Sequence, residues 1–126
     1  MRILVADDHE VMRKGVCAIL STGFSFAVCD EATNGQQAIE KALLHRPDII
    51  ILDVNMPVLG GLAAAKEVQR LLPDVPILLF TSNPSEQILS ESKKAGVQGF
   101  VLKEQAADTL VAAVKALLRK ETFFPR

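Results

Sequence analysis

Residues 48–57 read Asp-Ile-Ile-Ile-Leu-Asp-Val-Asn-Met-Pro. Four apolar residues in succession predict a strand that is covered on both faces, as strands of a parallel sheet are. The run ends on Asp53, so a carboxylate is expected at the carboxyl end of a buried strand. In an open α/β sheet, ligands bind in the crevice beyond that end of the strands. The stretch therefore predicts both the type of sheet and the edge that carries its chemistry.

Three further apolar runs also end on charged or hydroxyl residues. They are residues 3–6 before Asp7 and Asp8, residues 77–80 before Thr81, and residues 99–102 before Lys103. If these runs are parallel neighbours, three carboxylates, one hydroxyl and one ammonium group meet at one edge. Two carboxylates 4 Å apart repel by about 4 kcal/mol at an effective dielectric constant of 20, so the cluster requires a cation. All-oxygen ligands favour Mg²⁺, Mn²⁺ or Ca²⁺ over zinc.

Strand-length apolar runs alternate with segments of helical period along the whole chain. The predicted strands are 2–6, 25–31, 48–53, 76–81 and 98–102, and the predicted helices are 9–21, 35–46, 61–72, 84–95 and 106–120. This alternation predicts a single α/β domain with a doubly wound, five-stranded parallel sheet. The flavodoxin-like (βα)5 arrangement, with strand order 2-1-3-4-5, is the expected topology.

Polar residues mark where several helices are expected to begin. Asn34, with Gln37 three residues later, is typical of an N-cap with a capping box. Asn83, followed by a proline, predicts the start of the fourth helix. An aspartate between a strand and a helix is usually an N-cap, and Asp8 is the natural candidate here. Capping needs only one of the two adjacent acids, which leaves the other directed at the sheet edge.

Composition limits the classes of function. The 126 residues are 49% apolar and carry a net charge of −1, which fits one globular domain and gives no electrostatic case for nucleic-acid binding. No apolar stretch approaches the roughly 20 residues of a membrane span, and the first residues turn acidic too soon for a signal peptide. Cys17 and Cys29 have no CxxC spacing, so they are expected to be thiols in a reducing cytoplasm.

Thr81 and Lys103 each have an ordinary structural explanation. A lysine at a strand end is most often a solvated charge, and a threonine there often forms a turn. Beside three carboxylates, however, an ammonium group offsets their charge and binds a phosphoryl oxygen, and a hydroxyl donates to a second oxygen. A carboxylate is itself an accepted nucleophile for phosphoryl groups. Their joint placement predicts phosphoryl chemistry at this edge.

Five segments of the chain together resemble the receiver domain of response regulators, the phosphoacceptor half of bacterial two-component signalling. These segments are residues 4–9, 52–57, 61–62, 80–82 and 99–103. The resemblance spans nearly the whole chain. It implies that residues 1–120 form the receiver domain and that residues 121–126 begin a linker or a C-terminal tail.

The resemblance implies a role for each site residue. Asp53 is then the phosphoacceptor, which receives a phosphoryl group from a sensor histidine kinase. The domain is not expected to be an enzyme, since it catalyses only its own phosphorylation and dephosphorylation. The remaining assignments are Asp7, Asp8, Asp53 and the backbone carbonyl of Asn55 for Mg²⁺, Lys103 for the phosphate, and Thr81 and Phe100 for the conformational switch.

Residues 6–11 and 117–124 resemble the NarL/FixJ (LuxR-like) class, whose members usually continue into a helix-turn-helix domain. Transcriptional control is therefore expected, with DNA contacted only through an output domain that this chain does not contain. A stand-alone receiver that acts by protein–protein interaction or phosphorelay is the alternative. The resemblance implies a cytoplasmic protein without membrane contact, and it is compatible with a homodimer formed on phosphorylation.

Three rival interpretations are weaker. A haloacid-dehalogenase-like phosphatase expects Asp-x-Asp after the first strand, whereas Asp7 and Asp8 are adjacent. A flavodoxin-like nucleotide binder expects phosphate donors in that first loop, and two carboxylates would repel the phosphate. A degenerate receiver would lack some of the site residues. One departure from the receiver pattern is Glu104, which stands where many receivers have proline.

Overall fold

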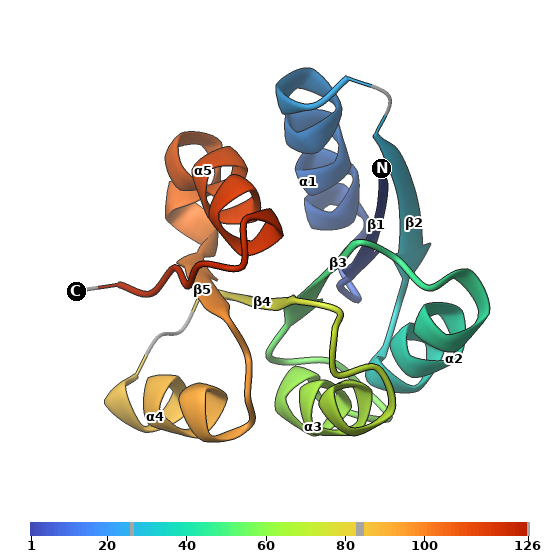
Figure 1. The fold of residues 1–126 in the computed structure, drawn as a ribbon, viewed down its shortest axis with the longest axis vertical. Helices are drawn as coiled ribbons and strands as arrows, with labels where there is room; N and C mark the ends of the chain where they lie inside the picture. Colours follow the sequence, from blue (N-terminus) through green and yellow to red (C-terminus); the bar gives the residue numbers. More distant parts are fainter. Residues whose placement is uncertain (26, 83–84, 126) are drawn as a thin grey trace.

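A computed structural model of the chain describes residues 1–25, 27–82 and 85–125. Its centre is a five-stranded sheet in the order β2-β1-β3-β4-β5, with every neighbouring pair parallel (Figure 1). The strands are β1 (Arg2–Ala6), β2 (Val28–Ala32), β3 (Ile49–Asp53), β4 (Ile77–Thr81) and β5 (Gly99–Leu102). The predicted flavodoxin-like topology is confirmed.

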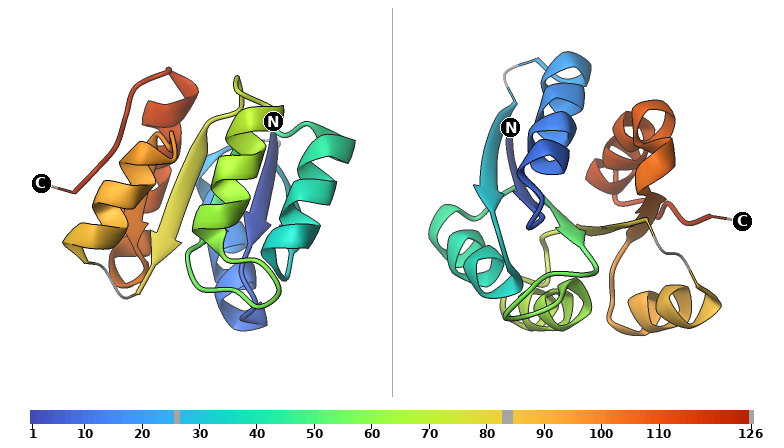
Figure 2. Two further views of the ribbon diagram at one scale, coloured as in Figure 1. Left: turned by 90° about the horizontal axis from the view of Figure 1, so that it is seen from below. Right: turned by 180° about the vertical axis from the view of Figure 1, so that it is seen from behind.

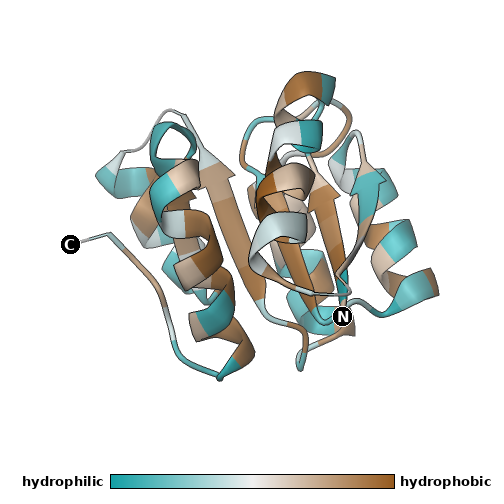
Figure 3. Ribbon diagram, turned by 90° about the horizontal axis from the view of Figure 1, so that it is seen from above, coloured by the Kyte–Doolittle hydropathy of each residue, from teal (hydrophilic) through white to brown (hydrophobic). Residues whose placement is uncertain are grey.

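Helices cover both faces of this sheet. They are α1 (Glu10–Gly23), α2 (Gly35–His45), α3 (Gly61–Leu71), α4 (Glu86–Lys94) and α5 (Ala106–Leu118), with a short 3₁₀ helix η1 (Lys103–Gln105) before α5. Helices α1 and α5 lie on one face, and α2, α3 and α4 lie on the other (Figures 1 and 2). The central strands are strongly apolar, as expected for strands that helices cover on both faces (Figure 3). Among the described helices, none is long and apolar enough to cross a membrane.

Alternate side chains of the central strands enter two separate cores. Ile50 and Leu52 pack with the side chains of α2 and α3, whereas Ile49 and Ile51 pack with those of α1 and α5. The same alternation of side chains continues to the strand ends, where it determines on which side of the sheet each polar side chain lies. Asp53 therefore follows on the α1–α5 side of the sheet.

Helix starts differ from the predictions in two places. Helix α1 begins at Glu10 with His9 at the N-cap and without a capping side chain, so the prediction that Asp8 caps it is wrong. The physical reason is that the helix starts one residue too late for Asp8, which lies just before the N-cap position, and Asp7 Oδ1 accepts the backbone N–H of the N-cap residue His9 at 2.9 Å. Helix α4 begins at Glu86, two residues later than predicted, and Ser85 caps it. Asn83 lies outside the described residues.

Other boundaries are close to the predictions. Asn34 caps α2 as predicted, and its side chain accepts the N–H of Gln37 at 2.8 Å. The Gln37 side chain reaches back to the N–H of Thr33 rather than to that of Asn34. Strand β2 begins three residues later than predicted, since α1 continues to Gly23.

The prediction of two free thiols is wrong, because Cys17 of α1 and Cys29 of β2 form a disulfide. Their Cα atoms lie 6.0 Å apart, which is within the usual range for a disulfide. The 12-residue separation matches no motif, so only the packing of α1 beside β2 brings the two residues together. Closing a loop of this length contributes about 3 kcal/mol by restricting the unfolded chain.

Candidate functional site

Three of the predicted site residues meet at the carboxyl edge of the sheet. Asp7 follows β1, Asp53 ends β3 and Lys103 follows β5, and all three occupy positions on the α1–α5 side of the strand alternation. The Lys103 ammonium lies 2.9 Å from Asp7 Oδ2 and 3.2 Å from Asp53 Oδ2. Asp7 and Asp53 are 1% and 3% exposed, so these charges are withdrawn from water.

Burial and charge set the protonation behaviour of the pair. Burial, reinforced by the neighbouring Asp7 carboxylate, raises the pKa of Asp53 despite the opposing effect of Lys103. For Lys103, burial alone would lower the pKa. The hydrogen bond to Asp7 and the charge of Asp53 outweigh burial, so the pKa of Lys103 is raised. One ammonium group therefore serves two carboxylates, and the site remains short of positive charge.

Asp8 and His9 complete a cluster of groups that can bind a metal. One ligand atom from each of Asp7, Asp8, His9 and Asp53 can be chosen so that all four lie within 4.8 Å of one another. Three carboxylates this close together fit a single hard divalent cation, because such cations prefer oxygen ligands. His9 is not among the predicted metal ligands, yet its Nδ1 lies 3.2 Å from both Asp7 Oδ1 and Asp8 Oδ1.

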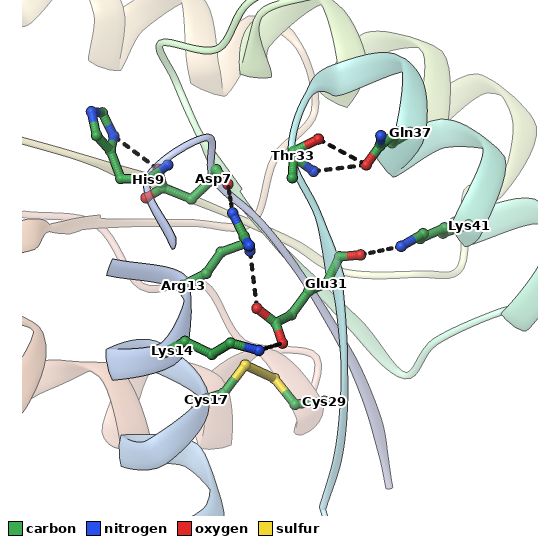
Figure 4. Close-up of polar contacts among 10 residues, drawn as sticks. All are labelled: Asp7, His9, Arg13, Lys14, Cys17, Cys29, Glu31, Thr33, Gln37 and Lys41. Atoms are coloured by element: carbon green, nitrogen blue, oxygen red, sulfur yellow. Dashed lines mark hydrogen bonds and ion pairs between the residues drawn. A yellow bond between two sulfur atoms is a disulfide. The ribbon is translucent and has the colours of Figure 1, made fainter. Parts of the chain in front are cut away.

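A network behind Asp7 holds its backbone in place (Figure 4). Arg13 of α1 donates from Nη1 to the Asp7 carbonyl oxygen and from Nε to Glu31 of β2, both at 2.9 Å. Lys14 pairs with the second oxygen of Glu31, and the hydrogen bond from Lys14 is the main reason that the pKa of Glu31 is lowered. No sequence spacing indicates that Arg13 and Glu31 belong to the site, because their partnership depends on the packing of α1 against β2.

Comparison with known proteins agrees with this geometry. The family model of the response regulator receiver domain matches residues 3–115. The chain belongs to the response regulator receiver domain family. The oxygen regulatory protein NreC of Staphylococcus epidermidis is 37% identical over 124 residues, which make up 98% of this chain and 57% of that protein. The chain spans about half the length of the curated relatives that it matches first.

Solved structures place this receiver domain in a class. A LuxR-family two-component response regulator from Aurantimonas sp. SI85-9A1 superposes with a TM-score of 0.92 at 28% identity, covering 97% of this chain and 87% of that one. The isolated receiver domain of RcsB from Salmonella enterica serovar Typhimurium was solved with the phosphomimetic BeF₃⁻. It superposes with a TM-score of 0.90 at 27% identity, covering 100% of this chain and 94% of that one. The predicted NarL/FixJ (LuxR-like) class is confirmed.

Of the other predicted site residues, Thr81 and Phe100 lie on strands β4 and β5, and Asn55 lies in the loop after Asp53. Thr81 ends β4, is fully buried, and pairs in register with Leu102 of β5. By strand alternation Thr81 and Phe100 lie on the α2–α4 side of the sheet, opposite to Lys103. Asn55 is exposed in the loop after β3, where its N–H lies 3.4 Å from Asp53 Oδ1. The role of its carbonyl as a metal ligand stays a prediction.

The β3–α3 loop holds Asp53 through close backbone contact with Gly61. The N–H of Gly61 donates to the Val54 carbonyl at 2.9 Å, and a Cβ on Gly61 would lie only 2.0 Å from the Asp53 carbonyl oxygen. Changing Gly61 to Ala is therefore expected to lower the free energy of unfolding by about 2 kcal/mol, since the backbone must move to relieve the clash. Urea unfolding followed by circular dichroism measures the change.

Gly15 provides the matched control for this substitution. It is exposed in the interior of α1, and nothing lies within 4 Å of the Cβ that alanine would add. Gly15→Ala is expected to stabilise the protein by about 0.5–1 kcal/mol through helix propensity. Equal effects at the two positions would show that contact with the Asp53 backbone does not constrain the loop.

Proposed function

We propose that this receiver domain accepts a phosphoryl group on Asp53 from a phosphohistidine of a sensor histidine kinase in a Mg²⁺-dependent reaction. The observation that carries the proposal is the placement of the buried Asp53 carboxylate beside Asp7, Asp8 and Lys103. A nucleophile, a set of oxygen ligands and an ammonium group then share one edge of the sheet. Phosphoryl transfer depends mainly on such positioning and charge neutralisation.

The transfer follows from the chemistry of these groups. An Asp53 oxygen attacks the phosphorus, the P–N bond of the phosphohistidine breaks, and the bond's electron pair leaves with the imidazole. Lys103, already 3.2 Å from Asp53 Oδ2, is placed to bind an oxygen of the incoming phosphoryl group. Water later hydrolyses the acyl phosphate, which restores the carboxylate and releases inorganic phosphate. The chemistry that we propose is therefore limited to the phosphorylation and dephosphorylation of the domain's own Asp53.

Mg²⁺ fits the donor set of this site. Asp7, Asp8 and Asp53 supply carboxylate oxygens within one cluster, and the carbonyl of Asn55 is the fourth ligand that we propose. A bound Mg²⁺ supplies positive charge that offsets both the carboxylates and the phosphoryl oxygens. Lys103 alone cannot do this, because it already serves Asp7 and Asp53.

The proposed output is the control of transcription. The relatives include the transcriptional regulatory protein LnrK of Bacillus subtilis, and the match covers 52% of the length of that protein. We therefore propose that the complete protein acts in the cytoplasm and contacts DNA through a helix-turn-helix domain outside this chain. Homodimerisation on phosphorylation belongs to the same proposal. A stand-alone domain that acts through protein–protein contacts is the alternative.

Incubation with acetyl phosphate tests the phosphoryl transfer without a kinase. With Mg²⁺ present, intact-mass spectrometry is expected to show the addition of one phosphoryl group, labile at alkaline pH as an acyl phosphate is. Peptide mapping after borohydride reduction is expected to locate the adduct at Asp53. Chelation of the divalent cation is expected to prevent the addition. An adduct on a serine or histidine, or an unchanged rate in chelator, would overturn the proposal.

A further inference from the structure

A disulfide joins α1 to an outer strand of the sheet, close to the candidate metal site. Cys17 of α1 and Cys29 of β2 form this bond, and β2 lies at one end of the strand order, next to β1. Both cysteines are half-buried, so a small reductant can reach them. In the reducing cytoplasm that we propose for the complete protein, disulfides are usually transient or redox-sensing. A bond of this kind is suited to a switch.

The disulfide continues a line of ion pairs between the same two elements (Figure 4). Cys17 follows Arg13 by four residues and Lys14 by three, so the three side chains share one face of α1. Cys29 precedes Glu31 by two residues, so these two side chains share one side of β2. Arg13 and Lys14 contact the Glu31 carboxylate at 2.9 and 2.7 Å. The covalent bond and the ion pairs therefore form one continuous contact between α1 and β2.

This contact holds the backbone of Asp7 from both sides. The Asp7 N–H donates to the Ala32 carbonyl of β2 at 3.0 Å, and the Asp7 carbonyl accepts from Arg13 Nη1 of α1 at 2.9 Å. The two groups that fix this backbone thus come from the two elements that the disulfide joins. The Asp7 carboxylate lies 2.9 Å from the Lys103 ammonium at the site. Movement of α1 on β2 would therefore displace a carboxylate of the site.

We propose that the Cys17–Cys29 disulfide is a redox switch that sets the affinity of the candidate metal site for Mg²⁺. When the disulfide is formed, Arg13 and Ala32 hold Asp7 in the position that a metal ligand requires. When it is reduced, α1 moves more freely on β2, and part of the binding free energy is used to order Asp7 again. The inference rests on the proposed function, because it takes Asp7 as a ligand of Mg²⁺.

A dithiol reductant opens the disulfide by thiol–disulfide exchange. One thiolate of the reductant attacks a sulfur of the disulfide, the S–S bond breaks, and a mixed disulfide forms. The second thiolate attacks the mixed disulfide, and the reductant leaves as an oxidised disulfide. Cys17 and Cys29 take up two electrons and two protons and become thiols. An oxidised dithiol runs the same steps in reverse, so the switch is reversible.

Reduction of the 126-residue chain with dithiothreitol tests the switch first in the metal-free protein. Intact-mass spectrometry is expected to show the gain of two hydrogen atoms. Amide hydrogen exchange followed by NMR is expected to accelerate at Asp7, whose N–H donates to β2. The Gln98 amide is the internal reference, because it donates to the Ile77 carbonyl of β4. The ratio of the Asp7 rate to the Gln98 rate is expected to rise about fivefold, whereas a uniform loss of stability would not raise it.

Titration with Mg²⁺ measures the coupling between the disulfide and the metal site. Reduction is expected to weaken Mg²⁺ binding about fivefold in isothermal titration calorimetry. The double variant Cys17→Ala, Cys29→Ala is expected to bind Mg²⁺ as weakly as the reduced wild type and not to respond to dithiothreitol. Coupling is reciprocal, so saturating Mg²⁺ is expected to shift the reduction equilibrium about fivefold toward the disulfide.

Arg13 is the positioning residue through which the disulfide acts on Asp7. Arg13→Met is expected to weaken Mg²⁺ binding to the oxidised protein and to lower the response to dithiothreitol below about twofold. Arg2→Met is the matched control, because Arg2 also pairs with an acid of β2, Asp30 at 3.3 Å, but begins β1 at the end away from Asp7. This control is expected to keep the full response to dithiothreitol.

The outcomes separate this inference from the proposed function. Equal binding of Mg²⁺ to the oxidised and reduced proteins would overturn the switch and leave the proposed function intact. Failure of Mg²⁺ to bind either form would overturn the Mg²⁺ dependence of the proposed function together with the switch. A disulfide that resists excess dithiothreitol in the folded protein would be a permanent brace and no switch. Cysteines that an oxidised dithiol leaves as thiols would overturn the switch as well.

Discussion

Replacing Asp53 with Asn is expected to abolish phosphoryl incorporation and, at the same time, to stabilise the metal-free protein. The loss of activity follows because an amide is not a nucleophile for phosphorus, and it should exceed about a hundredfold in the acetyl phosphate reaction. The gain in stability follows because Asp53 is a buried carboxylate close to Asp7, with one lysine shared between them. An isosteric neutral side chain removes that repulsion, for a gain on the order of 1 kcal/mol.

The stability difference should depend on pH with a defined sign. Because burial and Asp7 raise the pKa of Asp53, the folded protein binds this proton more tightly than the unfolded chain. The free energy of unfolding of the wild type therefore decreases as the pH rises from the ordinary carboxyl pKa, about 3.9, through the raised pKa. Above the raised pKa, Asp53 is ionised in the folded protein, and the full destabilisation from its buried charge is present. The advantage of the Asn variant should be largest there and should shrink toward pH 4.

Thermal unfolding in chelator at several pH values measures this difference. Asp74→Asn is the control, since Asp74 is exposed and its replacement is expected to change stability by less than about 0.5 kcal/mol. Addition of Mg²⁺ should reverse the order of wild type and Asn variant, because only the wild type keeps all three carboxylates. A variant that is less stable than the wild type in chelator at neutral pH would show that Lys103 already compensates both acids.

Much of this site can be predicted from sequence because strand ends are visible in sequence. A run such as residues 49–52 has to be buried, and the polar residue that follows it has to lie at the rim of the sheet. Parallel topology then brings Asp7, Asp53 and Lys103 to one edge, and strand alternation puts them on one side. Each strand end is predicted from residues that are neighbours in sequence, and the parallel topology that joins the ends is predicted from the alternation of strands with helices.

Features that depend on the packing of two distant elements could not be predicted in the same way. The Cys17–Cys29 disulfide and the contact of Arg13 with Glu31 both require the position of α1 against β2. The helix cap was predicted incorrectly at Asp8, because a single residue pattern fits both capping and metal binding. The pairing of Phe123 with Gly99 of β5 is a further case, since no sequence pattern distinguishes Phe123 from an ordinary apolar residue.

Replacing Lys103 with Met is expected to lower the free energy of unfolding by about 4 kcal/mol at neutral pH in the absence of a divalent cation. The side chain is 10% exposed, and its removal leaves two buried carboxylates without a counterion. Breaking a buried ion pair by removing one partner is far more costly than exchanging the whole pair. Lys14→Met is the matched control, because its partner Glu31 keeps Arg13, and the lysine is 60% exposed, so less than about 1 kcal/mol is expected.

The double variant with Asp53→Asn separates lost packing from uncompensated charge. If charge dominates, adding Asp53→Asn to Lys103→Met restores stability, because Asp7 is then the one buried carboxylate of the pair that has lost its lysine counterion. The two substitutions are then strongly non-additive. Mg²⁺ should likewise stabilise the Lys103→Met protein more than the wild type, since the cation replaces the missing positive charge. Additive effects in urea unfolding, with equal stabilisation by Mg²⁺, would assign the loss to packing of the lysine stem. Phosphorylation by acetyl phosphate should still fall about a hundredfold, because Mg²⁺ does not replace the ammonium group at the phosphoryl oxygen.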